Sequence, residues 1–199
     1  MKVNVDHCGI VILAAGRSSR LGRPKQLLMH NGKTLLRLAV NHALNTHFEP
    51  VAVVLGANYN EITDELNDLP VTIIYNSKWD EGIALSIQSG IKKIIENHPE
   101  TDGIILMVCD QPYLDSKLLL SLQEKQKETG LPIIASHYAN KMGTPALFHK
   151  QYFIELMELT GDAGAGKLIS ANLNKTASVE FPEGIMDIDT IEDFNALHS

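Results

Sequence analysis

Four basic side chains lie close together near the start of a chain whose formal net charge is −7. They are Arg17, Arg20, Arg23 and Lys25, and they fall within the stretch LAAGRSSRLGRPKQLL, residues 13–28. A guanidinium group offers forked, planar donors and an ammonium group a compact point charge, and both bind phosphate oxygens. A polyphosphate is therefore the ligand that this stretch favours, although a solvated basic turn is the usual reading of such a cluster.

The position of the stretch supports the phosphate interpretation. The apolar run Gly9–Leu13 has the composition of a buried strand, and the small residues Ala14, Ala15 and Gly16 follow it directly. Small residues let a ligand approach the backbone, and consecutive N–H groups in a turn form a concave anion site. In open α/β sheets, phosphates bind at the carboxyl ends of strands. The sequence thus predicts a triphosphate site at this strand end.

A carboxylate stands at the end of another apolar run. Asp110 follows Ile104–Val108, and Pro112 directs the chain away from the strand. Magnesium is commonly held by one or two carboxylates together with phosphate oxygens and water. Asp110 is therefore predicted to bind a metal at the same sheet edge as the basic loop. The alternative is an aspartate that opens a turn before proline.

Two further carboxylates lie near the C-terminus. Asp187 and Asp189 alternate on an extended segment and share one face, so either could complete a metal site with Asp110. The competing explanation is that Asp189 and Glu192 form a capping box at the start of a final helix. Both roles remain open at the level of sequence.

A third segment combines polar and small residues at the start of a predicted helix. Asn76 follows an apolar run, and Gly82 and Ser86 come shortly after it. A helix N-terminus attracts anions, and glycine permits close approach. Simple capping is the alternative for these residues. Trp79 is equally suited to cover the edge of the core or to stack on a ligand.

One motif points elsewhere in the chain. Gly161–Lys167 fits the G-x-x-x-x-G-K half of a phosphate-binding loop. However, Leu168 occupies the position that needs Ser or Thr, and Tyr152–Leu159 repeats at helical rather than strand spacing. We expect a glycine-rich turn here, or a loop that grips the anionic group of an acceptor.

Apolar runs of strand length alternate with helical segments along the chain. The expected strands are Ile10–Leu13, Val51–Leu55, Val71–Tyr75, Ile104–Val108 and Ile133–Ser136. Apolar stripes predict helices over Leu35–Leu44 and Ile83–Ile95, and Asp115 looks like the N-cap of a third. This alternation predicts an α/β fold: a three-layer, doubly wound, mostly parallel sheet, Rossmann-like. Ala146–Phe148 is expected to form a short strand in an excursion over the sheet.

Composition limits the classes of protein that remain. With 199 residues and 44% hydrophobic content, a single domain spanning residues 1–199 is expected. No apolar run reaches the length of a membrane span and no leader is evident, so we expect a cytoplasmic protein that contacts no membrane. The acidic balance argues against nucleic acid. Cys8 and Cys109 are expected at opposite ends of neighbouring strands, as unpaired packing residues.

Taken together, the motifs resemble those of nucleotidyltransferases that transfer a nucleoside monophosphate, and most closely the molybdenum cofactor cytidylyltransferase group. The resemblance covers most of the chain. It rests on residues 13–28, 76–86, 109–112, 143–145, 161–164 and 187–189. It implies a Rossmann-like nucleotidyltransferase fold and a reaction in which CTP and molybdopterin give the cytosine dinucleotide cofactor and pyrophosphate. It also implies magnesium as cofactor and a molybdoenzyme client as partner.

The resemblance assigns roles to matching positions. Arg17, Lys25 and Asp110 would be catalytic, and Asp110 and Asp189 would hold magnesium. The nucleotide would contact Leu13, Ala14, Ala15, Gly16, Arg17, Lys25, Asn76, Gly82, Ser86 and Asp110. The acceptor would contact Gln111, Thr144, Asp162 and Lys167. Ala15 resembles the cytidylyl type, whereas guanylyl enzymes usually carry glycine there.

Two positions depart from the family pattern, and both concern the acceptor. Thr144 stands where histidine is more common, and Gly166 stands where arginine is common. The chemistry itself needs no strong base, because an acceptor phosphate is already anionic and the protein must mainly align the reactants and neutralise charge. Transfer from GTP, a sugar phosphate acceptor, and a carrier that binds nucleotide without turnover remain as alternatives.

Overall fold

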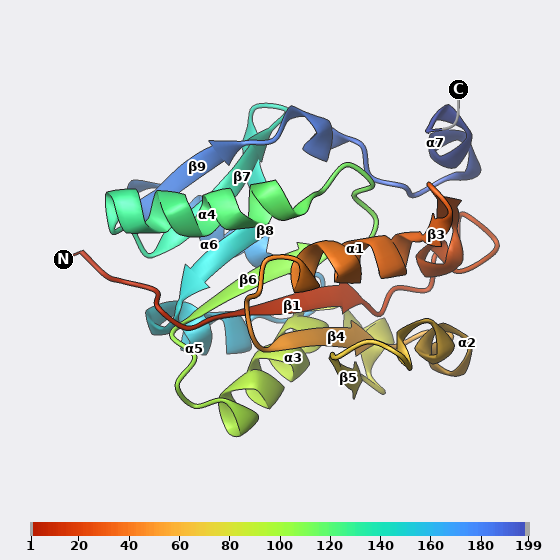
Figure 1. Cartoon of the computed structure of the whole chain (residues 1–199), viewed down its shortest axis with the longest axis horizontal. Coiled ribbons are helices and arrows are strands. Elements are labelled where there is room, and N and C mark those ends of the chain that lie inside the picture. Colours follow the sequence, from red (N-terminus) through yellow and green to blue (C-terminus); the bar gives the residue numbers. More distant parts are fainter. Residues whose placement is uncertain (1, 198–199) are drawn as a thin grey trace.

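A seven-stranded sheet forms the centre of the computed structural model, which describes residues 2–197 (Figure 1). In spatial order, its strands are β5 (Thr72–Tyr75), β4 (Val51–Leu55), β1 (Cys8–Ala14), β6 (Gly103–Val108), β8 (Lys141–His149), β7 (Ile133–Tyr138) and β9 (Thr176–Glu180). Strand β8 runs antiparallel to β6 and β7, and the other neighbouring pairs are parallel. The prediction of a mostly parallel sheet is confirmed.

Helices cover both faces of the sheet and give three layers (Figure 1). One face packs against α1 (Leu35–Leu44) and α4 (Ser116–Thr129). The other face packs against α3 (Ile83–Asn97), α5 (Phe153–Met157) and α6 (Ala165–Ala171). The short elements are β2 (Met29–His30), β3 (Lys33–Thr34), α2 (Tyr59–Thr63) and α7 (Ile191–Ala196), and Ile62 of α2 is fully buried in the core on the side of α1. The doubly wound architecture is thus confirmed over the described residues, while residues 1 and 198–199 of the expected domain lie outside them.

Strand β1 is buried on both faces because its side chains alternate between the two cores. Ile10 and Ile12 belong to the core beneath α1 and α4, whereas Val11 and Leu13 belong to the core beneath α3. The strand pairs in parallel with β4 on one side and β6 on the other, and Leu13 lies opposite Val108. This register brings the loop after β1 beside the residues that follow β6.

The expected place of Ala146–Phe148 is wrong. These residues form part of β8, which lies inside the sheet between β6 and β7 rather than in an excursion over it. Ala146 pairs with Leu106 on one side and with Ala135 on the other, and its side chain is fully buried. Strand β9, on the edge of the sheet, was not expected, because its half-buried sequence TASVE lacks a continuous apolar run.

The two cysteines are unpaired and buried, as expected from their positions. Burial raises the pKa of both Cys8 and Cys109 to about 12, so both remain thiols at neutral pH.

No helix within residues 2–197 is long and apolar enough to cross a membrane.

Asp115 caps α4 as the sequence predicts, because its side chain accepts a hydrogen bond of 2.9 Å from the Leu118 N–H. Replacing Asp115 with alanine should lower the free energy of unfolding by about 1 kcal/mol, since one N–H at the helix start loses its partner. Urea denaturation would measure this change. Asp115→Asn keeps a capping oxygen and should retain most of the stability, and equal losses in both variants would contradict the capping role.

Candidate active site

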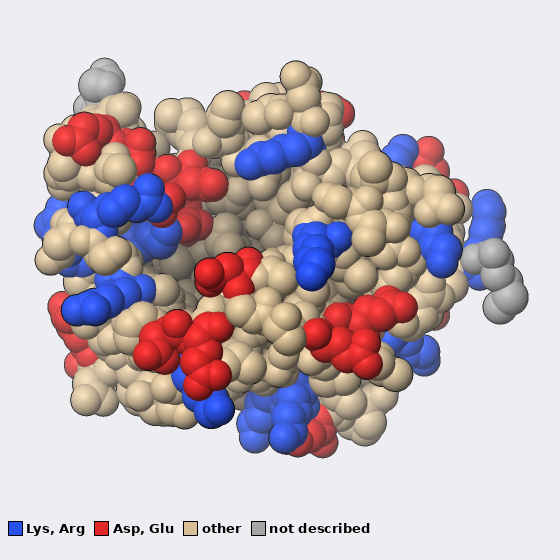
Figure 2. Space-filling model, turned by 180° about the vertical axis from the view of Figure 1, so that it is seen from behind, with Lys and Arg blue, Asp and Glu red and all other residues tan. Residues whose placement is uncertain are grey.

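A cavity of about 350 Å³ opens at the carboxyl ends of β1 and β6. The sequence-predicted residues that line it are Leu13–Arg17, Lys25, Gly82, Ser86, Asp110 and Asp162. Figure 2 shows the molecule hollowed on this side, with basic and acidic side chains both on the rim of the hollow. The volume lies within the range of small-molecule sites, roughly 300–1,000 Å³.

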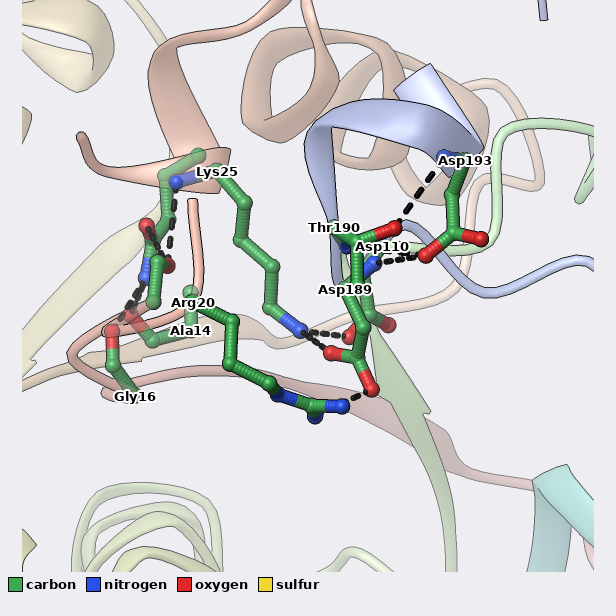
Figure 3. A network of polar contacts seen from close by, with 10 residues as sticks. Ala14, Gly16, Arg20, Lys25, Asp110, Asp189, Thr190 and Asp193 are labelled. Atoms are coloured by element: carbon green, nitrogen blue, oxygen red, sulfur yellow. Dashed lines mark hydrogen bonds and ion pairs between the residues drawn. The ribbon is translucent and has the colours of Figure 1, made fainter. Parts of the chain in front are cut away.

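Lys25 connects the two carboxylates that the sequence proposes as metal ligands (Figure 3). Its Nζ donates a hydrogen bond to Asp110 Oδ2 and a second, of 2.9 Å, to Asp189 Oδ1. Arg20 donates a hydrogen bond of 2.7 Å to the other oxygen of Asp189. The side chains of Lys25 and Asp110 are 15% and 16% exposed, whereas Arg20 is 67% exposed. The cluster therefore has a buried centre and a solvated rim.

The electrostatics of the cluster keep Lys25 charged. Burial alone would lower the pKa of Lys25, but the charge of Asp110 and hydrogen bonds to Asp110 and Asp189 outweigh it and raise that pKa. The hydrogen bond from Lys25 also lowers the pKa of Asp189. An ammonium group is thus fixed at the wall of the cavity, where an anionic ligand would meet it.

Of the other basic residues in the loop, Arg17 lines the cavity and Arg23 contacts the C-terminal helix. Arg17 is exposed and lines the cavity. The guanidinium of Arg23 lies 5.6 Å from the ring centroid of Phe194, on α7. A cation over an aromatic face is attracted to it. Arg23 therefore contacts the C-terminal helix, and Arg17 and Lys25 are the basic residues that reach the cavity.

The capping alternative for Asp189 is wrong by one residue. Thr190 is the N-cap of α7: its hydroxyl accepts from the Asp193 N–H at 3.2 Å, and the Asp193 carboxylate accepts from the Thr190 N–H at 2.8 Å. The capping box thus pairs Thr190 with Asp193, not Asp189 with Glu192. This register leaves the carboxylate of Asp189 for Lys25 and Arg20.

The donor set fits a magnesium-type ion that also has other ligands. Asp110 and Asp189 converge on one ammonium group, so both already face a common cation. Residues 2–197 contain no group of three or more His, Cys, Asp or Glu side chains arranged to hold a metal. Two carboxylates completed by phosphate oxygens and water are typical of magnesium. Burial and the negative charge of Asp110 raise the pKa of the neighbouring Asp187 to about 6.

The glycine-rich segment at Gly161 has a packing role. Gly82 has a φ of +113°, and a Cβ atom there would lie 2.2 Å from the carbonyl group of Gly161. The Ala84 N–H at the start of α3 donates to Gly161 O at 3.1 Å. This contact brings Asp162 to the cavity. Helix α5, not a strand, precedes the segment, so the context required for a phosphate-binding loop is absent here.

Asn76 lies behind the cavity wall rather than in it. Its amide donates a hydrogen bond of 3.0 Å to Ser86 Oγ, and both side chains are buried. Ser86 does line the cavity. Trp79 packs against Gly56, where an added Cβ would lie 2.4 Å from the tryptophan Cβ, and it also lines the cavity; stacking on a ligand stays a prediction.

Three of the residues expected to contact the acceptor lie outside this cavity. Gln111 and Thr144 meet at Tyr138: burial raises the pKa of Tyr138, and hydrogen bonds from both residues partly oppose that shift. Gln111 also donates to Gly184 O at 3.3 Å. Lys167 is exposed on α6. The structure therefore groups Gln111 with Thr144 at Tyr138.

Sequence reasoning missed Gln26, which also lines the cavity and is fully buried. Its amide donates hydrogen bonds to Ala14 O, at the end of β1, and to Gly16 O, in the loop that follows. The available signal was a glutamine directly after Lys25 and before two leucines, in a segment otherwise expected to be solvated.

Two named proteins show how this chain relates to others in sequence. It is 37% identical over 106 residues to nicotine blue oxidoreductase of Paenarthrobacter nicotinovorans, a match to 52% of this chain and half the length of that protein. It is 24% identical over 186 residues to the molybdenum cofactor cytidylyltransferase of Escherichia coli (strain K12), which covers 92% of each chain.

A solved structure and a family model agree with this relationship. The manganese complex of Rv0371C from Mycobacterium tuberculosis H37Rv superposes with a TM-score of 0.78 at 26% identity, covering 96% of this chain and 97% of that one. The model of the MobA-like NTP transferase domain matches residues 10–177, which include the basic loop, Asp110 and every strand of the sheet except the end of β9 and the first two residues of β1. This chain belongs to the family of MobA-like NTP transferases.

Proposed function

We propose that this protein transfers CMP from CTP to molybdopterin and releases pyrophosphate, giving the cytosine dinucleotide form of the molybdenum cofactor. The observation that carries the proposal is the largely enclosed Lys25 between Asp110 and Asp189, beside a backbone loop of small residues. Such a site pairs a fixed positive charge for phosphates with carboxylates for a metal ion. Membership of the NTP transferase family supports the reaction class.

In this proposal the residues of the chain align the substrates and neutralise the charge of the phosphates, and none of them abstracts a proton. Lys25 and Arg17 balance the charge of the triphosphate, and the backbone from Ala14 to Gly16 lets the phosphates approach closely. Magnesium held by Asp110 and Asp189 would supply further charge neutralisation when bound. An oxygen of the acceptor phosphate forms a bond to the α-phosphorus. The bond from that phosphorus to the oxygen bridging the α and β phosphates breaks, and pyrophosphate leaves with the electron pair.

The choice of nucleotide and acceptor rests on two supports. Ala15 resembles the cytidylyl type of the family, and the relative from Escherichia coli is named a molybdenum cofactor cytidylyltransferase. The acceptor would approach from the side of Gln111 and Thr144. Gln111 follows β6, and Thr144 lies within β8. Asp162 would line the boundary between the two substrates, because it faces the cavity from the Gly161 turn.

A nucleotide-by-acceptor screen tests this function. Purified protein is incubated with magnesium and each of CTP, GTP, ATP and UTP, with and without molybdopterin, and pyrophosphate release is followed with a coupled assay. We expect release with CTP that depends on both molybdopterin and magnesium. Release with GTP, or only with a sugar phosphate, would reassign the substrates within the family. Nucleotide binding without release for any combination would favour a carrier and refute the transferase.

A further inference from the structure

Gln26 is fully buried and lies in the short 3-10 helix Lys25–Leu27. Its Nε2 group donates to two backbone carbonyls, Ala14 O at the end of β1 at 2.8 Å and Gly16 O in the following loop at 3.0 Å. Both N–H groups of one amide are thus directed at the loop that follows β1. Dashed lines in Figure 3 mark these contacts at Ala14 and Gly16.

These two hydrogen bonds fix the orientation of whole peptide groups. In a trans peptide the N–H points away from the C=O of the same plane. When Gln26 holds the carbonyls of Ala14 and Gly16, the N–H groups of Ala15 and Arg17 point to the opposite side. The carbonyl of Ala15 is fixed separately, by the Ala57 N–H at 3.0 Å. All three peptide planes of the loop are therefore set by neighbouring groups.

Ser18 and Gln26 together connect the loop to the charged cluster around Lys25. Ser18 Oγ accepts a hydrogen bond of 3.0 Å from the Lys25 N–H and lies 3.4 Å from Gln26 Oε1. Lys25 directly precedes Gln26 in the chain, so the residue that orients the backbone donors is covalently joined to the residue that supplies the ammonium group. The backbone donors and the ammonium group are thereby connected by these hydrogen bonds and by adjacent positions in the chain.

We propose that Gln26 is a positioning residue for phosphate binding: its amide turns the peptide N–H groups of Ala15 and Arg17 toward the phosphates of the nucleotide. The inference rests on the proposed function only in assuming that a nucleotide binds at this loop. It is independent of the base and of the acceptor. Its chemical content is that the amide donors of Gln26, rather than its volume, set the affinity.

The test compares Gln26→Glu with a matched control, Gln126→Glu. Gln126, on α4, is also fully buried, and its amide also donates to two backbone carbonyls, Val3 O at 2.9 Å and Leu131 O at 3.5 Å. It does not line the cavity. Both changes place a carboxylate against carbonyl oxygens and should lower the melting temperature. The control therefore separates loss of stability from loss of binding.

Titration calorimetry with magnesium and either CTP or inorganic tripolyphosphate provides the readout. We expect Gln26→Glu to weaken both ligands by about 10- to 100-fold, because two hydrogen bonds that orient the loop are lost. Gln126→Glu should bind both ligands as the wild type does. In a ¹⁵N-labelled wild-type sample, tripolyphosphate should shift the amide signals of Ala15 and Arg17, and these shifts should diminish in the Gln26 variant.

Gln26→Met is measured alongside, because the new carboxylate of Gln26→Glu also repels phosphates within the cavity. Methionine keeps a neutral side chain of similar length without amide donors, so it should show a similar weakening if the donors set the affinity. Unchanged affinity in a folded Gln26 variant would overturn the positioning role. Equal weakening in the Gln126 control would overturn it as well. Failure of the wild-type protein to bind CTP would instead refute the proposed function, so the two failures are distinguishable.

Discussion

Replacing Lys25 with methionine should slow pyrophosphate release by about 100- to 1,000-fold, the loss typical of removing one donor that stabilises developing negative charge. Methionine is similar in length but carries no charge. Because the lysine is 15% exposed and fixed by Asp110 and Asp189, no neighbouring group can take its place without rearrangement. Initial rates at saturating CTP and magnesium would measure the effect.

Two controls accompany this prediction: the same substitution at a distant lysine, and a substitution at Lys25 that keeps the charge. Lys92→Met removes a charge from the exposed side of α3, where Lys92 faces Glu96 at 3.9 Å, and should leave the rate unchanged. Lys25→Arg restores the charge with a larger, planar group and should recover only part of the activity. Near-normal turnover in Lys25→Met would show that the triphosphate does not lie against this residue.

Replacing Asp110 with asparagine should also reduce turnover by about 100-fold or more, because the substitution removes one anionic oxygen ligand from the metal site. In contrast to Lys25→Met, it should also weaken the binding of manganese in the presence of CTP, which electron paramagnetic resonance can follow. Lys25 is no metal ligand, so its replacement should not weaken manganese binding. The pair of variants thus separates the phosphate role from the metal role.

A surface aspartate provides the control for Asp110. Asp64 accepts a hydrogen bond from Asn67 at an exposed position, and Asp64→Asn should change neither turnover nor manganese affinity. Unchanged manganese binding in Asp110→Asn would refute a metal role for Asp110. Its contact with Lys25 would then account for any loss of activity.

Local patterns were sufficient to predict the strands β1, β4, β5, β6 and β7 of the sheet. The run Gly9–Leu13 is apolar at every position after the glycine, which is typical of a strand buried on both faces, and β1 is such a strand. Its predicted loop does line the cavity, because the residue that ends a central strand must emerge at the sheet edge. Asp110 lies at the same edge because it follows β6, which runs parallel to β1.

Contacts between distant segments could not be predicted in this way. The place of β8 depends on pairing with β6 and β7, and an apolar triplet does not encode its partners. The role of Gly82 depends on Gly161, which approaches it from a separate part of the chain. The buried amide of Gln26 resembled a solvated loop residue because its carbonyl partners are ten and twelve residues away.

The amino-acid sequence by itself determined that a basic loop of small residues follows one apolar strand and that a carboxylate follows another, because hydrophobic patterning is a local property. The resemblance to a known family named Asp189 as the partner of Asp110, but only the tertiary structure places the two carboxylates together, at the ammonium group of Lys25. Asp187 and Asp189 share one face of an extended segment, so sequence spacing could not separate them. The capping box at Thr190 fixes the start of α7, and the carboxylate of Asp189 meets Lys25 at 2.9 Å.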